Sequence, residues 1–108
     1  MAQHVLIIDD TPEIARLLQI HLEQHGYLTS VAHRGDDALA IVRDGFSGLV
    51  ILDLNLPDYQ ELNLFNELRR ENTSLPIIII TAHGTIDMAI EAIRLGAYDF
   101  LTKSESFL

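Results

Sequence analysis

The chain contains no cysteine, and none of its apolar stretches is long. Without cysteine it can form neither disulfides nor thiolate metal sites, which fits a reducing compartment. No run approaches the roughly 18 apolar residues that a membrane span requires, and the segment Met1-Ala2-Gln3-His4 lacks the basic region and apolar stretch of a secretory signal. We therefore expect a protein of the cytoplasm with no membrane contact.

Basic residues are also scarce. The chain has 7 lysines and arginines against 16 acidic residues, and its formal net charge is −9. Nucleic acid backbones attract basic surfaces, so this charge argues against direct nucleic acid binding. Any DNA reader is expected to be a separate partner or another domain.

The length of 108 residues and the apolar content of 48% predict one domain. Such a chain can bury a core, but it is short for an α/β sheet and has no room for a second domain. We therefore expect residues 1–108 to form a single globule.

Four short apolar segments each end at a residue that can handle phosphate or metal. If these segments are parallel strands of one sheet, their polar ends meet along one edge, where open α/β sheets bind ligands. The segments are 5–8 before Asp9-Asp10, 49–52 before Asp53, 77–80 before Thr81, and 98–102 before Lys103.

Helical spacing of apolar residues separates these segments. Thr11 is expected to cap a helix that has Pro12 at its first position and ends near Gly26. Repetition of a strand followed by a helix predicts an α/β fold. Further helices are expected over 35–44, around 62–68 and from Thr85 to Gly96, with additional strands over 27–32 and 97–102.

Together these residues resemble the receiver domain of two-component response regulators, over essentially the whole chain. The resemblance implies a flavodoxin-like, doubly wound sheet of five parallel strands in the order 2-1-3-4-5. The stretch from Thr81 to Thr102 looks most like receivers of bacterial enhancer-binding transcription activators. The matching positions are Asp9-Asp10, Asp53 with Pro57 after it, Thr81-Ala82, and Lys103 three residues past Phe100.

Three carboxylates at one sheet edge repel one another, so a hard divalent cation such as Mg²⁺ is the natural neutraliser. We expect Asp10 and Asp53 to be direct ligands, Asp9 a ligand through water, and the backbone carbonyl of Asn55 another ligand. A carboxylate can also attack a phosphoryl group and form an aspartyl phosphate. Asp53 is the expected phosphoacceptor.

Other residues are expected to assist this reaction. Lys103 supplies a positive charge to the phosphoryl oxygens, Thr81 donates a hydroxyl, and Ala82 leaves room for the group to enter. The resemblance implies that Thr81 moves toward the phosphoryl group and that Phe100 turns inward, while Asn55 and His83 tune its lifetime. It implies a signalling domain that assists its own phosphorylation and dephosphorylation, not an enzyme with a separate substrate.

The implied partners are a histidine kinase or phosphotransfer protein, and an output domain or other segment beyond Leu108. The family's last helix would begin near Leu108, so we expect a C-terminally truncated receiver with an incompletely covered sheet face that invites homodimerisation or docking.

Two further departures from the family pattern concern the site. Ser104 stands where proline usually follows the lysine, which makes a trans peptide the expectation and leaves the reach of Lys103 open. Glu61 replaces a usual glycine and would strain its turn if φ is positive there.

Three other functions remain open from the residues. An interaction module that no longer accepts phosphate is favoured by Glu61 and Ser104 and opposed by the acidic residues and Lys103. A Mg²⁺-dependent phosphohydrolase lacks a second catalytic acid at Asn55, and flavin binding is disfavoured because the acidic 9–11 turn would repel a cofactor phosphate. His21 and His25 are one helical turn apart, but without a third ligand we expect them to be ordinary exposed histidines.

Overall fold

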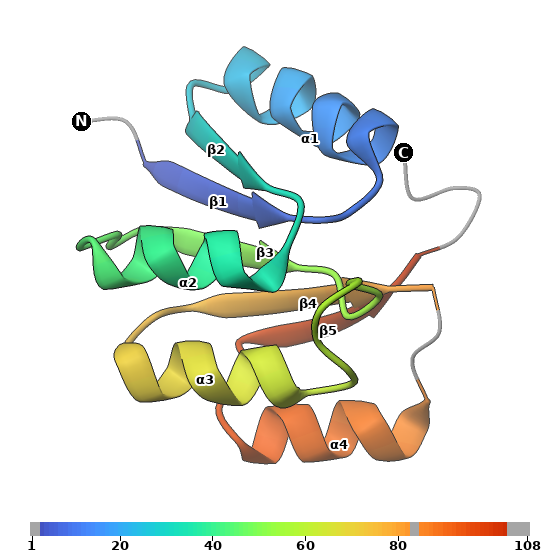
Figure 1. Cartoon of the computed structure of the whole chain (residues 1–108). Helices are drawn as coiled ribbons and strands as arrows, with labels where there is room; N and C mark the ends of the chain where they lie inside the picture. Colours follow the sequence, from blue (N-terminus) through green and yellow to red (C-terminus); the bar gives the residue numbers. More distant parts are fainter. Residues whose placement is uncertain (1–2, 83–84, 104–108) are drawn as a thin grey trace.

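The computed structural model describes residues 3–82 and 85–103, and within them five strands alternate with four helices (Figure 1). The strands are β1 (His4–Ile8), β2 (Leu28–Ala32), β3 (Leu49–Leu52), β4 (Ile77–Thr81) and β5 (Asp99–Thr102). The helices are α1 (Pro12–Gln24), α2 (Gly35–Arg43), α3 (Asn63–Glu71) and α4 (Ile86–Arg94). The alternation expected from the sequence is confirmed.

The five strands form one parallel sheet in the order β2-β1-β3-β4-β5, as expected. The register pairs Ile8 with Leu52, and Thr81 with Thr102. Asp9, Asp53 and Lys103, the residues that follow these strands, therefore meet at one edge of the sheet.

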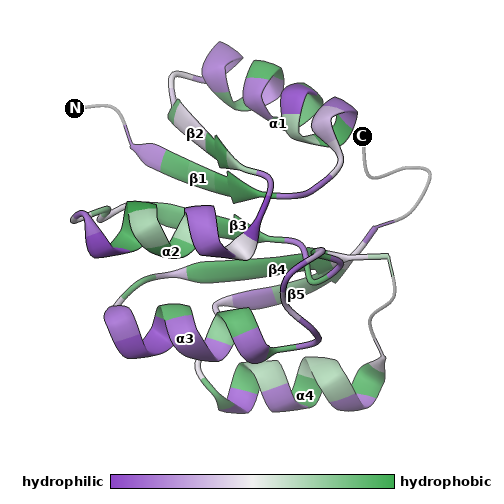
Figure 2. Cartoon of the chain, in the orientation of Figure 1, coloured by the Kyte–Doolittle hydropathy of each residue, from purple (hydrophilic) through white to green (hydrophobic). Residues whose placement is uncertain are grey.

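The larger core lies between the sheet and helices α2, α3 and α4. Alternate residues of the strands point into it because successive side chains of a strand face opposite sides. The central strands are mostly hydrophobic (Figure 2), since α2, α3 and α4 pack on one face of the sheet and α1 packs on part of the other. Fully buried members of this core include Leu6, Leu52, Leu64, Phe65, Leu68, Ile77 and Ile79.

The opposite face of the sheet is covered by α1 alone among the described helices (Figure 1). Val5 and Ile7 pack there against Ala15, with Leu18 and Leu22 partly buried beside them. Farther along the same face the cover ends, and the side chain of Leu101 is 43% exposed. Within residues 3–82 and 85–103, no helix besides α1 packs on this face.

Two threonines precede helices and behave differently. The Oγ1 atom of Thr85 accepts the N–H of Met88 at 3.1 Å and caps α4, as its position predicts. Thr11 occupies the N-cap position of α1, as expected, but its side chain makes no capping hydrogen bond. Its N–H donates to Asp9 Oδ1 at 2.9 Å, and its hydroxyl turns toward Asp10 Oδ1 at 3.5 Å.

Candidate functional site

Two aspartates are held at the carboxyl edge by backbone bonds that extend the sheet. The N–H of Asp9 donates to the carbonyl of Ala32 at 3.0 Å, and the N–H of Asp53 donates to the carbonyl of Ile8 at 2.8 Å. Both side chains are buried: Asp9 is 2% and Asp53 is 4% exposed. Buried carboxylates need strong partners.

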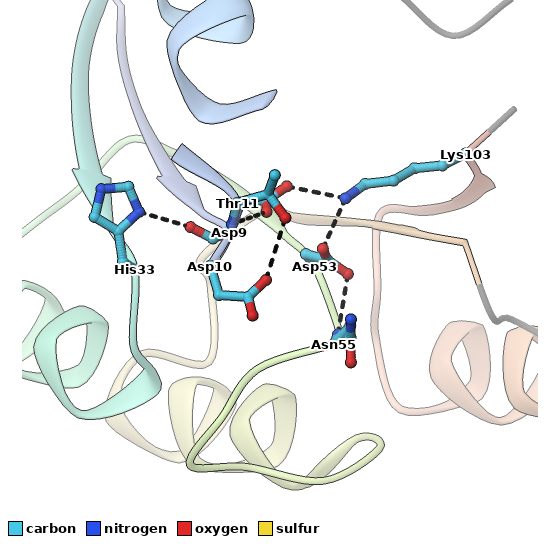
Figure 3. Close-up of polar contacts among 7 residues, drawn as sticks. All are labelled: Asp9, Asp10, Thr11, His33, Asp53, Asn55 and Lys103. Atoms are coloured by element: carbon cyan, nitrogen blue, oxygen red, sulfur yellow. Dashed lines mark hydrogen bonds and ion pairs between the residues drawn. The ribbon is translucent and has the colours of Figure 1, made fainter. Parts of the chain in front are cut away.

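Asp10 completes a cluster of three carboxylates (Figure 3). One oxygen from each of Asp9, Asp10 and Asp53 lies within 4.8 Å of the other two. Asp10 is more exposed than the other two, so the cluster opens to solvent on its side. Closely spaced oxygen ligands with a net negative charge fit a hard divalent cation.

Lys103 reaches into this cluster from the end of β5. Its Nζ atom donates to Asp53 Oδ2 at 2.7 Å and to Asp9 Oδ2 at 2.9 Å (Figure 3). Its backbone N–H donates to the carbonyl of Thr81 at 2.8 Å, which fixes the backbone position from which the side chain extends. The open question about the reach of Lys103 is therefore answered, while Ser104 lies outside the described residues.

Burial and charge act against each other in this pair. Burial lowers the pKa of the Lys103 ammonium, but bonds to Asp53 and Asp9 outweigh it and raise that pKa, so the lysine stays cationic. Burial raises the pKa of the Asp53 carboxyl, although the N–H of Asn55 and the Lys103 ammonium oppose the rise. The Asn55 N–H donates to Asp53 Oδ1 at 3.0 Å, and the Lys103 ammonium donates to Asp53 Oδ2. Each carboxylate oxygen of Asp53 therefore has its own hydrogen-bond donor.

Thr81 lies beside the cluster at the end of β4 and is 2% exposed. It lines a small cavity of about 140 Å³ together with Leu54, Asn55, Glu61 and Met88. The backbone of Glu61 has a φ of 49°, which confirms that this turn places a non-glycine residue in the left-handed region.

The remaining expected site residues are less closely placed. Ala82 follows Thr81 and is exposed, and Phe100 is partly buried against the larger core. His83 lies outside the described residues. The Nδ1–H of His25 donates to the carbonyl oxygen of His21 at 2.9 Å. Among the described residues no third metal-ligating side chain joins this pair.

Sequence reasoning missed two contacts near the site. The Nδ1 atom of His33 lies 2.9 Å from the carbonyl oxygen of Asp9, and Asp58 accepts two backbone N–H groups of α2. His33 and Asp9 are 24 residues apart, so no local pattern pointed to the first contact. The turn residues Pro57-Asp58 were visible, but nothing in the sequence indicated which helix Asp58 would meet.

A buried carboxylate beside an acidic pair and a lysine, at the carboxyl edge of a flavodoxin-like sheet, is the arrangement of a phosphoacceptor signalling domain. The chain belongs to the response regulator receiver domain family, whose family model matches residues 5–107. It is a receiver domain of two-component systems, as the resemblance implied.

Individual relatives agree with this assignment. The C4-dicarboxylate transport transcriptional regulatory protein DctD of Rhizobium meliloti is 38% identical over 102 residues, which are 94% of this chain and 22% of the relative. The beryllofluoride-activated NtrC4 receiver domain dimer is 33% identical with a TM-score of 0.87, and the match covers 95% of this chain and 85% of that one. TrrA of Thermotoga maritima, in complex with Mg²⁺ and BeF, is 30% identical with a TM-score of 0.84, covering 97% and 90%.

The chain spans less than half the length of the curated relatives it matches, from 44% down to about a fifth. Several of these relatives are named transcriptional regulatory proteins, which agrees with the resemblance to receivers of transcription activators. No helix among residues 3–82 and 85–103 combines the length and apolar character needed to cross a membrane.

Proposed function

We propose that Asp53 accepts a phosphoryl group from a histidine kinase or phosphotransfer protein in a Mg²⁺-dependent reaction, and that the aspartyl phosphate changes how the domain binds its partners. The observation that carries this proposal is the bridge from Lys103 to Asp53 and Asp9 beside the third carboxylate, Asp10.

In this reaction an oxygen of the Asp53 carboxylate attacks the phosphorus atom. A phosphorus–oxygen bond forms, the phosphorus–nitrogen bond of a phosphohistidine breaks, and the released imidazole nitrogen takes a proton from solvent. Lys103 is already within reach of Asp53, so its ammonium can move to the oxygens of the arriving phosphoryl group. Thr81 offers its hydroxyl from the neighbouring strand.

Asp9, Asp10 and Asp53 would hold the divalent cation, with the carbonyl of Asn55 as a further ligand. When bound, the cation neutralises charge on the transferring oxygens. Mg²⁺ is the ion we propose, and the Mg²⁺ and BeF complex of TrrA supports this choice. The chain's contribution is to keep two of the three carboxylates buried and fixed before the donor arrives.

The response is proposed to involve Thr81, Phe100, Ala82 and His83, with Asn55 and His83 tuning the phosphoryl lifetime. The partners that respond to the phosphorylated domain would be an output domain or a further segment. We also propose a homodimer of this domain, which the NtrC4 receiver dimer supports. With its charge of −9 the domain itself would not contact nucleic acid. We place it in the cytoplasm, as a phosphoacceptor that assists its own phosphorylation and dephosphorylation.

Incubation with a small phosphodonor and MgCl₂, followed by intact-mass analysis, tests the proposal. We expect one phosphoryl adduct on the wild-type chain, none on Asp53→Asn, and none when a chelator removes Mg²⁺. No adduct on the wild type would favour the phosphorylation-independent interaction module. An adduct that survives Asp53→Asn would contradict the assignment of the phosphoacceptor.

A further inference from the structure

The loop between β3 and α3 begins at the site and is fastened to the N-terminus of α2. Asp58 Oδ1 accepts the N–H of Gly35 at 2.8 Å, and Asp58 Oδ2 accepts the N–H of Asp36 at 3.0 Å. N–H groups in the first turn of a helix have no acceptor inside the helix. The N-cap residue Arg34 provides no side-chain acceptor, so Asp58 caps α2 from 23 residues away in sequence.

Tyr59 strengthens the same contact. Its hydroxyl donates to Asp36 Oδ1 at 2.9 Å, and its ring covers Gly35 so closely that a Cβ atom there would lie 2.2 Å from the ring carbon Cδ2. The Asp58 side chain is only 12% exposed, and Arg34 Nη2 lies 4.0 Å from its Oδ2 atom. Asp58 and Tyr59 therefore hold the loop to the start of α2 by three hydrogen bonds.

The fastened loop carries a disfavoured backbone conformation. Glu61 has a φ of 49°, and it is the only non-glycine residue with positive φ among the described residues. Left-handed conformations are unfavourable for a residue with a Cβ atom, and they persist where the surrounding structure enforces them. The contacts of Asp58 and Tyr59 lie two to three residues before Glu61 and can supply that enforcement.

The other end of the loop holds Asn55. Its N–H donates to Asp53 Oδ1, and its neighbours Leu54 and Leu56 are each 9% exposed. The N–H of Leu56 donates back to the carbonyl of Leu54 at 3.1 Å, so the chain turns tightly around Asn55. A change in the path of the loop would therefore move the Asn55 carbonyl.

We propose that Asp58 is a positioning residue for the metal site: by capping α2 it keeps the β3–α3 loop in the strained shape at Glu61 and thereby fixes the Asn55 carbonyl. This inference rests on the proposed function in one respect, the assignment of that carbonyl as a ligand of the cation. Asp58 acts through Asn55 and touches neither the phosphoryl group nor the cation.

Isothermal titration of MgCl₂ into wild-type and variant chains tests the inference without measuring activity. We expect Asp58→Ala to weaken Mg²⁺ binding about tenfold, the size of effect seen when residues that orient metal ligands are removed. Asp58→Asn should recover part of the affinity because its amide oxygen still accepts one N–H group. Circular dichroism would verify that each variant is folded.

A second substitution separates positioning from general loss of stability. Glycine adopts positive φ without strain, so Glu61→Gly should let the loop keep its shape without the cap. We expect the double variant Asp58→Ala/Glu61→Gly to bind Mg²⁺ within about threefold of the wild type. At saturating Mg²⁺, phosphorylation of Asp58→Ala by a small phosphodonor should also approach the wild-type rate.

Thr85→Ala is the matched control, because it removes the cap of another helix. It should lower stability as Asp58→Ala does and leave the Mg²⁺ affinity unchanged. Equal Mg²⁺ affinities of Asp58→Ala and wild type, or equal weakening by Thr85→Ala, would overturn the inference while leaving the proposed function intact. A wild-type chain that binds no Mg²⁺ would overturn both.

Discussion

Lys103 balances two buried carboxylates that the sheet places side by side. Its side chain is 14% exposed, and its ammonium is within 3 Å of Asp9 and Asp53. The sequence indicated that a lysine would stand at this edge, and the structure adds that it bridges both aspartates. The contact with Asp9 joins the end of β5 to the end of β1, although β3 and β4 lie between these strands in the sheet. No local pattern encodes such a contact.

Replacing Lys103 with methionine should destabilise the metal-free domain by about 3 kcal/mol, because two buried carboxylates lose their cationic partner. Urea unfolding at neutral pH measures this change. Added MgCl₂ should restore part of the loss by neutralising the same carboxylates. A variant as stable as the wild type in the presence of a chelator would contradict the role of Lys103 as the cationic partner of Asp9 and Asp53.

Arg69 connects three elements at the opposite edge of the sheet. From α3 its Nη1 atom donates to the carbonyl of Leu75 at 2.6 Å and to that of Thr73 at 3.2 Å, while Nη2 donates to the carbonyl of Gly96 at 2.8 Å. The guanidinium carbon lies 5.3 Å from the centre of the Phe65 ring. Burial lowers the pKa of Arg69, and the side chain joins α3, the start of β4 and the turn after α4.

Arg69→Lys should lower the free energy of unfolding by about 2 kcal/mol, because an ammonium cannot present the planar fork that meets these carbonyls together. Arg70→Lys is the matched control, since Arg70 is the exposed neighbour on the same helix. We expect the control to unfold at nearly the wild-type urea concentration. Equal midpoints for the two variants would show that the Arg69 contacts contribute little.

The cap that Asp58 provides to α2 should depend on pH. Burial raises the pKa of the Asp58 carboxyl, but the N–H groups of Gly35 and Asp36 and the charge of Arg34 outweigh it, so its pKa falls below the ordinary value of 3.8. The carboxylate of the neighbouring residue Asp36 accepts the Tyr59 hydroxyl at 2.9 Å. A lowered folded-state pKa stabilises the protein above the unfolded value, and this contribution is lost as pH falls through the folded value.

We therefore expect wild-type stability to fall more steeply than that of Asp58→Asn as pH drops from about 5 toward the lowered pKa. Thermal unfolding across this range measures the difference. Asp37→Asn removes the same charge from the first turn of α2 and serves as the control. Parallel pH profiles for the wild type and Asp58→Asn would show that the cap does not titrate in this range.

On the scale of the whole molecule, acidic charge exceeds basic charge and part of that excess is concentrated at one edge. The net charge of −9 destabilises the compact state through self-repulsion, and the cluster of Asp9, Asp10 and Asp53 adds a local source. Monovalent salt screens the first effect, whereas a divalent cation bound by the cluster would relieve the second.

Raising NaCl from a low concentration should stabilise the domain modestly. MgCl₂ at equal ionic strength should add about 1.4 kcal/mol when its concentration is ten times its dissociation constant, because the ion binds only the folded state. Asp10→Asn should keep the response to NaCl and lose most of the extra response to MgCl₂. If chemical denaturation finds the same extra stabilisation in both chains, Asp10 is not a ligand.

The sequence by itself determined the alternation of strands and helices, because hydrophobic periodicity is a local property. It also placed Asp9, Asp10, Asp53, Thr81 and Lys103 at one edge, since the ends of parallel strands meet there. Only the tertiary structure decided which partners these residues take. The bridge from Lys103 to Asp9 spans 94 residues, and the cap from Asp58 to Gly35 spans 23. Such contacts depend on how helices and loops pack around the sheet, and no spacing within one element encodes them.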